Sequence, residues 1–258
     1  MMNDLQHVIR AAVSAGNIIL KLRDTNFSKT NKESNRDVVT EADLISEKVI
    51  IDFLSKEIKN FSYLSEELNI LVGNSDEYWA IDPIDGTANY ISGSKNFCVS
   101  IGNVYGEILN KGVVFAPALN DLYYASKELG SYKNQQKLKV VENNLCDSLI
   151  AISFPGKTDR DFSKDIYKVL YDINSQSSGI LRLGSASLHL ANHAENIFGG
   201  CIGFNAPIWD IAAGLAICKN AGSSYKLFKT DNEHNYHYIS APPLLLEELQ
   251  QMLKKVLR

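Results

Sequence analysis

The stretch of residues 78–90, YWAIDPIDGTANY, constrains this chain more than any other part of its sequence. The apolar residues Trp79–Ile81 indicate the end of a buried strand. We expect that strand to stop at Asp82-Pro83, because proline cannot donate to a sheet ladder and keeps the residue before it extended. The turn Asp85-Gly86-Thr87 can then release its backbone amides into the first turn of a helix. Two carboxylates beside free N–H groups can hold a cation and an anion together, although a proline turn and a capping aspartate explain the same residues.

Length and composition place the chain among ordinary globular proteins. Its 258 residues suffice for one large domain or two lobes that share an interface. The net charge of -4 and the pI of about 5.8 leave no basic field to attract nucleic acid or a membrane surface. The apolar runs are too short to span a bilayer, and the first residues do not resemble a secretory signal. The four cysteines are widely spaced and mostly in apolar runs, which is typical of reduced, buried thiols. We therefore expect a cytoplasmic protein.

The pattern of apolar and turn residues predicts a mixed α and β protein. We expect an N-terminal α+β lobe over residues 1–145 and a C-terminal α/β lobe over residues 146–258, packed as one unit. Residues 25–35 are polar and helix-breaking and predict a mobile loop. Helices are expected at 5–22, from about 40 to 53, 162–173, 184–195, 211–221 and 244–257, with strands at 61–64, 97–104, 112–115, 122–125, 149–154, 180–183, 201–204 and 238–240 and a hairpin over 130–141.

Four acids lie at predicted element boundaries, where side chains can converge while the elements stay rigid. They are Glu66, Asp82, Asp85 and Asp210. If they converge, they cannot all stay ionised without cations, since carboxylates at close range raise one another's pKa. Ligands that are all oxygen favour Mg²⁺ over zinc or copper. Each acid taken alone is more often a helix cap or a solvated side chain, so the prediction rests on the set.

Four motifs in this sequence resemble those of the inositol monophosphatase family. They are Asp82-Pro83-Ile84-Asp85-Gly86-Thr87 preceded by Trp79, the segment Trp209–Gly214, the segment Asp37–Asp43, and Ser65-Glu66-Glu67. They occur in the family's order across nearly the whole chain. The resemblance implies a layered α/β/α/β/α sandwich of the sugar-phosphatase type. It also implies a lithium-sensitive phosphoric monoester hydrolase that uses two or three Mg²⁺ ions and is usually a homodimer.

The same resemblance implies roles for individual acids. The first Mg²⁺ is expected at Glu66, Asp82 and the backbone carbonyl of Ile84. The second is expected at Asp82, Asp85 and Asp210, so that Asp82 bridges the two ions. A third, weaker ion is expected near Glu66. Most of these ligands fall in the N-terminal lobe, and the last falls in the C-terminal lobe.

Catalytic and substrate-binding roles follow from the same matching. Thr87, hydrogen-bonded to Asp43, is expected to orient a metal-activated water as the nucleophile, and Glu66 is the third catalytic residue. The amides of Gly86 and Thr87 are expected to bind phosphate at a helix N-terminus. Contacts to the phosphate or to the rest of the substrate are implied for Lys32, Asp85, Gly86, Thr87, Gly184, Ser185, Ala186 and Asp210.

The sequence predicts the type of reaction more narrowly than it predicts the substrate. Inositol monophosphate or a related polyol or sugar phosphate is favoured, with a bisphosphate nucleotide, histidinol phosphate and fructose 1,6-bisphosphate as alternatives on the same fold. Inositol-selective members of the family commonly carry a glutamate seven residues before the Trp-Asp aspartate, where this chain has Gly203, with Asn205 as a possible substitute. A regulatory protein that binds transcription or ribosome-assembly machinery is the alternative of another class. The complete set of acids favours catalysis, and the net charge argues against direct nucleic-acid binding.

Two histidines, His189 and His193, are four residues apart in a predicted helix. This spacing can chelate zinc. No glutamate follows His189 and no third ligand is evident in the sequence. We therefore interpret both as polar positions on a helix face.

Overall fold

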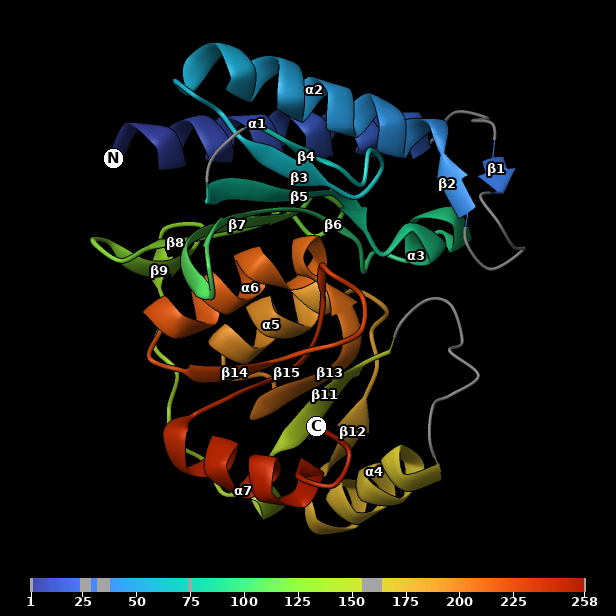
Figure 1. The fold of residues 1–258 in the computed structure, drawn as a ribbon, viewed down its shortest axis with the longest axis vertical. Helices are drawn as coiled ribbons and strands as arrows, with labels where there is room; N and C mark the ends of the chain where they lie inside the picture. The colour runs from blue at the N-terminus through green and yellow to red at the C-terminus, as the bar shows by residue number, and fades with distance from the viewer. Residues whose placement is uncertain (1, 24–28, 32–37, 74–75, 155–163, 258) are drawn as a thin grey trace.

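The computed structural model describes residues 2–23, 29–31, 38–73, 76–154 and 164–257 (Figure 1). Lys32, one of the expected substrate-side residues, lies outside the described residues. Within the segment expected to be a loop, β1 (Lys29–Asn31) pairs antiparallel with β2 (Val38–Thr40). That part of the prediction is wrong, because pairing with a second short strand satisfies the backbone of a segment that looks irregular in isolation.

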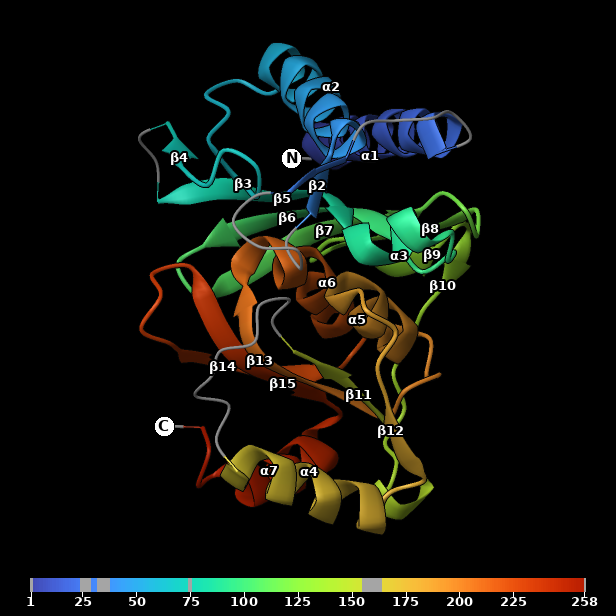
Figure 2. The same cartoon turned by 90° about the vertical axis from the view of Figure 1, so that its right-hand side faces the viewer.

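The elements form five layers, as Figures 1 and 2 show from two directions. Helices α1 (Met2–Arg23) and α2 (Glu41–Glu57) cover the outer face of an eight-stranded sheet. Helices α5 (Ala186–Ala194) and α6 (Ile208–Asn220) lie between that sheet and a five-stranded sheet. Helices α4 (Lys164–Gln176) and α7 (Pro243–Leu253) cover the far face of the second sheet. The expected α/β/α/β/α architecture is confirmed.

The eight-stranded sheet comes from the first half of the chain. Its order is β10 (Gln136–Lys137), β9 (Gly130–Lys133), β8 (Asp121–Ser126), β7 (Ile108–Ala116), β6 (Cys98–Tyr105), β5 (Glu77–Asp85), β3 (Tyr63–Ser65) and β4 (Leu71–Val72). Neighbouring strands are antiparallel except β3 and β5, which are parallel. The short helix α3 (Thr87–Ser92) follows β5 directly.

The five-stranded sheet comes from the second half. Its order is β12 (Gly179–Leu181), β11 (Leu149–Ser153), β13 (Gly200–Pro207), β15 (Asn235–Ala241) and β14 (Ser224–Lys229), and the 3₁₀ turn η1 (Leu145–Asp147) precedes β11. Strand β11 is parallel to both neighbours, while β15 is antiparallel to β13 and β14. The sequence did not predict β14, because its half-buried and exposed residues do not alternate as a strand's usually do.

Strand β5 continues through Pro83 and ends at Asp85, which corrects the expected stop at Asp82-Pro83. Asp82 pairs with Ser100 and Asp85 with Cys98, so the register shifts between them. Proline is tolerated at such a bulge because no ladder hydrogen bond is required of it there. Residues three apart in a regular strand point to opposite faces, and the extra residue removes that opposition. The bulge can therefore place both aspartates on one side.

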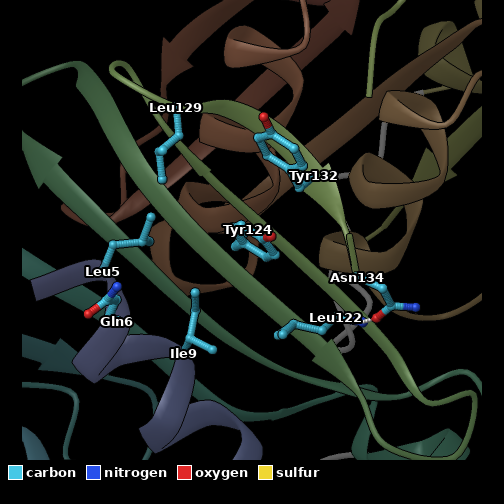
Figure 3. Close-up of a pocket in the computed structure, with 8 residues that line it drawn as sticks. All are labelled: Leu5, Gln6, Ile9, Leu122, Tyr124, Leu129, Tyr132 and Asn134. Carbon is cyan, nitrogen blue, oxygen red and sulfur yellow. Dashed lines mark hydrogen bonds between the residues drawn. The ribbon is translucent and has the colours of Figure 1, made fainter. Parts of the chain in front are cut away.

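A shallow apolar groove of about 400 Å³ lies where α1 crosses β8 and β9. Figure 3 shows its lining, in which Leu5 and Ile9 of α1 face Tyr124 and Tyr132 of the sheet. The two tyrosine rings are stacked, with centroids 5.5 Å apart. The lining contains no acidic or basic side chain, so this groove is not a candidate for the chemistry that the acids predict.

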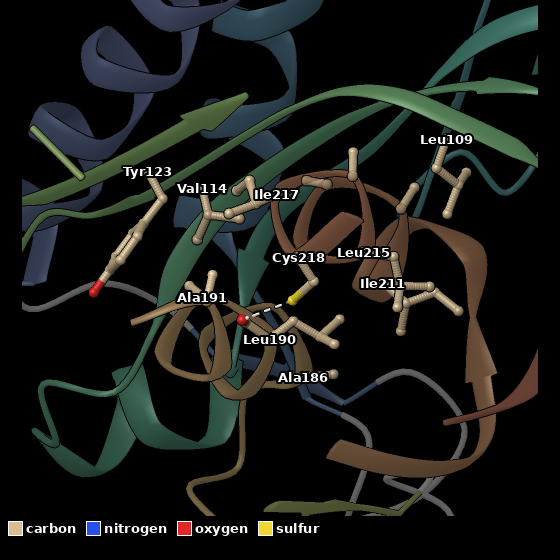
Figure 4. Close-up of a cluster of buried hydrophobic side chains, with 14 of the residues drawn as sticks. Leu109, Val114, Tyr123, Ala186, Leu190, Ala191, Ile211, Leu215, Ile217 and Cys218 are labelled. Carbon is tan, nitrogen blue, oxygen red and sulfur yellow. Dashed lines mark hydrogen bonds between the residues drawn. The ribbon is translucent and has the colours of Figure 1, made fainter. Parts of the chain in front are cut away.

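Helix α6 is buried on all sides because both sheets and α5 pack around it (Figure 4). Its residues Ile211–Cys218 are all buried, as expected of a helix that is apolar around its whole circumference. Gly102 and Gly112 allow α6 to approach the sheet closely: a Cβ atom would lie 2.4 Å from the Ala213 nitrogen at Gly102 and 2.3 Å from the Ala213 oxygen at Gly112. The start of α6, which carries Asp210, is therefore fixed against the eight-stranded sheet.

Two further expectations concern the cysteines and the membrane. All four cysteines are free thiols, and Cys98, Cys201 and Cys218 are buried, but Cys146 is exposed in η1. Among the helices of the described segments, none combines the length and the apolar composition that crossing a bilayer requires.

Candidate active site

The structure brings together the four acids that the sequence singled out. Asp82 and Asp85 come from the bulged end of β5, Glu66 from the residue after β3, and Asp210 from the first turn of α6. The Glu66 amide donates to the Ile81 carbonyl at 3.1 Å, which fixes the loop beside β5. Asp82 and Asp85 are only 2% and 6% exposed, whereas Glu66 and Asp210 are half-buried. The cluster is therefore buried at its base and open towards Glu66 and Asp210.

The pKa values of these acids report their proximity. Burial, followed by the negative charges of Glu66, Asp85 and Asp210, raises the pKa of Asp82 well above its ordinary value. Burial and the charges of Asp85 and Glu66 likewise raise the pKa of Asp210. Burial raises the pKa of Asp85 to about 6, although hydrogen bonds from neighbouring residues oppose the shift. Neighbouring carboxylates thus make Asp82 and Asp210 harder to ionise, whereas burial alone does so for Asp85.

This donor set fits a hard divalent cation. A cation would offset the mutual repulsion of the acids, and the nearby ligand atoms are the oxygens that Mg²⁺ prefers. As placed, no three His, Cys, Asp or Glu side chains of the described residues enclose a point where an ion could sit. Asp85 instead turns one carboxylate oxygen towards hydroxyl and amide donors.

Thr87, at the start of α3, contacts two of the predicted site residues. Its Oγ1 lies 3.2 Å from Oδ1 of Asp43 and 3.1 Å from the carbonyl oxygen of Ile84. Asp43 is fully buried in the first turn of α2. Because a hydroxyl has one hydrogen, donation to the Asp43 carboxylate and donation to Ile84 are alternatives. The Ile84 amide in turn donates to Oδ1 of Asp82 at 2.9 Å.

Gly86 makes the sharp turn between β5 and α3. Its φ of 95° lies in the left-handed region that favours glycine. A Cβ atom here would also lie 2.9 Å from the Asn96 carbonyl oxygen and 3.3 Å from that of Gly184. The backbone of Gly86 thus packs directly against the segment of the second half of the chain that was expected to contact substrate.

That segment reaches Asp85 through neutral donors. The Ser185 hydroxyl donates to Oδ2 of Asp85 at 2.7 Å, and the Ser187 amide donates to the same oxygen at 2.6 Å. Ser185 is also the N-cap of α5, accepting from the Leu188 amide at 3.2 Å. Gly184 and Ala186 flank this serine in the same turn. Sequence reasoning missed Ser187, whose only signal was its position beside the Gly-Ser-Ala segment.

His189 and His193, interpreted from the sequence as polar positions on a helix face, are core residues, each 1% exposed. His193 contacts the Phe198 carbonyl at 2.9 Å and the Ser223 hydroxyl at 2.8 Å. His189 contacts the Ser153 hydroxyl at 2.8 Å and accepts from the Leu183 amide at 2.7 Å. Burial lowers the pKa of both to about 4. All four ring nitrogens therefore have partners.

Gly203 lies in β13 directly between Ser153 of β11 and Tyr238 of β15. The Tyr238 ring lies across it, so a Cβ atom at Gly203 would come within 1.9 Å of Cε1 of Tyr238. The Tyr238 hydroxyl reaches over Gly203 and donates to Oγ of Ser153 at 3.1 Å. Asn205, the suggested substitute for a carboxylate, turns Oδ1 towards Thr230 and Asn235, each at 3.2 Å. The expected glutamate position is thus filled by a tyrosine ring.

Comparison with known sequences gives full-length matches. The sequence model described as the inositol monophosphatase family matches residues 2–254. A protein of Aquifex aeolicus named fructose-1,6-bisphosphatase/inositol-1-monophosphatase is 37% identical over 229 residues, which cover 85% of this chain and 84% of that protein. A protein of Pasteurella multocida named Nus factor SuhB is 31% identical over 264 residues, which cover 99% of this chain and 98% of that protein.

Solved structures agree with the sequence matches. The extragenic suppressor protein suhB of Bartonella henselae superposes with a TM-score of 0.86 at 28% identity, covering 97% of this chain and 98% of that one. The inositol monophosphatase of Anabaena superposes with a TM-score of 0.84 at 27% identity, covering 98% of this chain and 95% of that one. Both similarities extend over both sheets and all five layers.

Proposed function

Because the chain belongs to the inositol monophosphatase family, we propose that it hydrolyses a small phosphate monoester in a Mg²⁺-dependent reaction. The observation that carries the proposal is the cluster of four acids beside the Thr87–Asp43 pair at the start of α3. Buried carboxylates that raise one another's pKa destabilise a fold unless a cation or a proton offsets them. Their retention in the core is explained by a function that needs a cation there.

The family assignment suggests how the acids divide between ions. Glu66, Asp82 and the Ile84 carbonyl would hold one Mg²⁺, and Asp82, Asp85 and Asp210 a second, with a third near Glu66. Bound Mg²⁺ lowers the pKa of a coordinated water and stabilises charge on the attacking and leaving oxygens of the phosphoryl group. The half-buried Glu66 and Asp210 leave the cluster accessible to a phosphate ester.

Thr87 orients the attacking water in this proposal. When its hydroxyl donates to Asp43, 3.2 Å away, its oxygen lone pairs are left to accept a hydrogen bond from a water. The same donation releases the Ile84 carbonyl, which otherwise accepts from Thr87 at 3.1 Å, for an ion. Asp43 thus selects which way the Thr87 hydrogen points. The amides of Gly86 and Thr87, at the turn into α3, bind the phosphate oxygens.

We propose a polyol or sugar phosphate as the substrate class. The Aquifex relative named for fructose-1,6-bisphosphatase and inositol-1-monophosphatase supports this class. The tyrosine ring over Gly203 argues against a strict requirement for inositol, because no carboxylate can stand at that position to accept from an inositol hydroxyl. Fructose 1,6-bisphosphate, histidinol phosphate and a 3′-phosphonucleotide are retained as alternatives, and lithium sensitivity, a cytoplasmic location and a homodimer belong to the same proposal.

A second candidate function is favoured by the relatives named Nus factor SuhB. One of them matches 99% of this chain at 31% identity. In this proposal the protein also docks on transcription or ribosome-assembly machinery through another protein, since its net charge of -4 gives no basic field for nucleic acid. The two functions are compatible, because the acid cluster occupies only a small part of the surface.

The test is phosphate release from a panel of esters. Inositol 1-phosphate, fructose 1,6-bisphosphate, histidinol phosphate and a 3′-phosphoadenosine nucleotide are each assayed with Mg²⁺, with EDTA and with added lithium. We expect release that requires Mg²⁺, is abolished by EDTA and is weakened by lithium, with inositol and sugar phosphates accepted at similar rates. Release that is equal with and without EDTA would reject the metal mechanism. A strong preference for the 3′-phosphonucleotide would reassign the substrate.

A further inference from the structure

Both backbone groups of Leu183, just before the turn that reaches Asp85, are held by side chains. Its amide donates to Nε2 of His189 at 2.7 Å, from α5. Its carbonyl accepts from Nδ2 of Asn89 at 2.8 Å, from α3. One side chain from α5 and one from α3, in different halves of the chain, therefore hydrogen-bond to the amide and the carbonyl of the same residue. His189 lies outside the acid cluster and its motifs, and Asn89, although it lies within the stretch 78–90, has no role in the proposed chemistry.

Asn89 is fully committed to this contact. Its Nδ2 also donates to the Asn96 carbonyl at 2.7 Å, so both amide hydrogens are used on backbone oxygens. Gly184, with φ of 85°, fits against the same side chain, because a Cβ atom there would lie 2.9 Å from Nδ2 of Asn89. The carbonyl of Gly184 in turn lies against Gly86. The contact thus seats residues 183–184 on the turn between β5 and α3.

The protonation state of His189 follows from its partners. A backbone amide can only donate, so Nε2 carries no hydrogen and the neutral ring has its hydrogen on Nδ1. Nδ1 then donates to Oγ of Ser153, 2.8 Å away. Burial lowers the pKa of His189 to about 4, which keeps the ring neutral and Nε2 an acceptor at physiological pH.

We propose that His189 is a positioning residue that, together with Asn89, clamps Leu183 and thereby holds the Ser185 hydroxyl and the Ser187 amide against Asp85. Ser185 and Ser187 contact Oδ2 of Asp85 at 2.7 and 2.6 Å, and only Gly184 separates Leu183 from Ser185. Release of Leu183 frees the turn that aims both donors. Asp85 then loses the contacts that fix the rotation of its carboxylate.

His193 provides a matched control on the same helix. It is as buried as His189, its pKa is lowered to the same value of about 4, and both of its nitrogens have partners. Those partners, Phe198 and Ser223, make no hydrogen bond to residues 183–187 in the interactions of the described residues, although the Phe198 ring lies edge-on to the His189 ring with centroids 6.1 Å apart. His189→Leu and His193→Leu therefore remove comparable buried hydrogen bonds, and only the first releases the clamp.

The experiment compares His189→Leu, His189→Gln and His193→Leu by hydrogen exchange and by kinetics. Loss of an outer partner of a ligand commonly lowers activity about 10- to 100-fold, so we expect His189→Leu to lose that much kcat/KM and to speed exchange at the amides of residues 187 and 188. His189→Gln, whose amide can accept from Leu183 and donate to Ser153, restores both readouts to within about threefold. His193→Leu leaves both near wild type at temperatures where it is folded.

Equal effects of His189→Leu and His193→Leu, or unchanged exchange in a folded His189→Leu, would overturn the proposal. If His189→Leu does not fold, Asn89→Ala reaches the same residue from a half-buried position and must speed the same amides. The kinetic readout rests on the proposed function, whereas the exchange readout does not. A wild-type protein without phosphatase activity would therefore reject the proposed function and leave the clamp to be decided by exchange.

Discussion

The two sides of the acid cluster are built from different chemistry. The side on the eight-stranded sheet presents carboxylates: Asp82 and Asp85 from the β5 bulge, with Glu66 beside them. The side formed by α5 and the five-stranded sheet presents neutral groups, namely Ser185, Ser187 and, behind them, His189. Asp210 is the acid that α6 adds from the second half of the chain. One side supplies charge, and the other holds that charge in place without adding to it.

This division gives the two sides opposite responses to pH. The raised pKa of Asp85, about 6, means that its folded state holds a proton more tightly than the unfolded chain does. Stability from that proton is present below the ordinary pKa of an aspartate and is lost as pH rises through the folded value. The lowered pKa of the histidines, about 4, has the reverse effect, since the unfolded chain binds protons more readily. In metal-free protein the acids therefore lower the free energy of unfolding at neutral pH, and the histidines lower it at acid pH.

The largest expected effect comes from neutralising the charged side with Asp85→Asn. We expect kcat/KM with Mg²⁺ to fall by at least about 1000-fold, or about 4 kcal/mol of transition-state stabilisation. In EDTA at pH 7 the same variant should unfold at a higher urea concentration than wild type, because a buried carboxylate with a raised pKa has been removed. Parallel kinetics and urea titrations measure both changes.

Glu195→Gln is the matched control for that variant. It makes the same change in charge at the far end of α5, where Glu195 contacts Tyr123 and Lys133 at 2.8 Å. It should leave kcat/KM close to wild type and give no gain in stability. Near-wild-type turnover by Asp85→Asn would sink the proposed mechanism and erase the contrast between the two sides.

The second expected effect is a loss of stability when the buried histidines of the neutral side become protonated. As pH falls from about 6.5 towards 4, each buried histidine should cost up to about 3 kcal/mol of unfolding free energy, because a shift of one pKa unit corresponds to about 1.4 kcal/mol. His193→Gln should therefore flatten the loss of stability over that range while leaving the enzyme active. Urea unfolding in EDTA at pH 7.5, 6.0 and 4.5 measures the slope. A slope identical to that of wild type would show that His193 is not held neutral.

The contrast also explains what the sequence could predict. The charged side is encoded almost contiguously, so the six residues from Asp82 to Thr87 predicted the acids, the turn and the start of a helix together. The Thr87–Asp43 hydrogen bond that the resemblance implied is present at 3.2 Å. The mixed α and β class followed from the helical and strand patterns, and the five-layer order followed from the family resemblance. Local rules failed at Pro83, where pairing with β6 on both sides of a bulge carries the strand past a residue that usually ends one.

The contacts of the neutral side could not be predicted from the sequence in the same way, because most of them join residues far apart in the chain. No sequence signal near Gly203 predicts that the Tyr238 ring fills the space over it. No local sequence signal near His189 predicts that its ring nitrogens form hydrogen bonds with Ser153 and Leu183. A histidine pair at helical spacing looks the same on an open face and in a core, and only tertiary packing decides between them. In the proposed function substrate preference depends on this side, and it is the less predictable half of the function for that reason.

The third effect tests the packing over Gly203. Gly203→Ala should destabilise the fold by about 1–3 kcal/mol, because its Cβ would overlap the fully buried ring of Tyr238. Gly200→Ala, in the same strand with its nearest neighbour 3.2 Å away, should cost less. In Gly203→Ala/Tyr238→Leu the two costs should not add, since the smaller side chain relieves the overlap. Additive costs measured by urea unfolding would show that the ring does not fill this position.

The smallest expected effect tests whether the Tyr238 hydroxyl contributes to the clamp that His189 and Asn89 form on Leu183. Tyr238→Phe removes one hydroxyl that donates to Ser153 at 3.1 Å. Ser153 still accepts from His189, so no buried donor is orphaned, and the loss should be about 1 kcal/mol of unfolding free energy. Because His189 keeps Leu183 in place, kcat/KM should stay within about twofold of wild type, in contrast to the loss expected on losing an outer partner of a ligand. A tenfold fall in a folded Tyr238→Phe protein would extend the positioning network across Gly203 to β15. The neutral side would then act as one unit, with the orientation of Asp85 set as far away as the last strand pair of the second sheet.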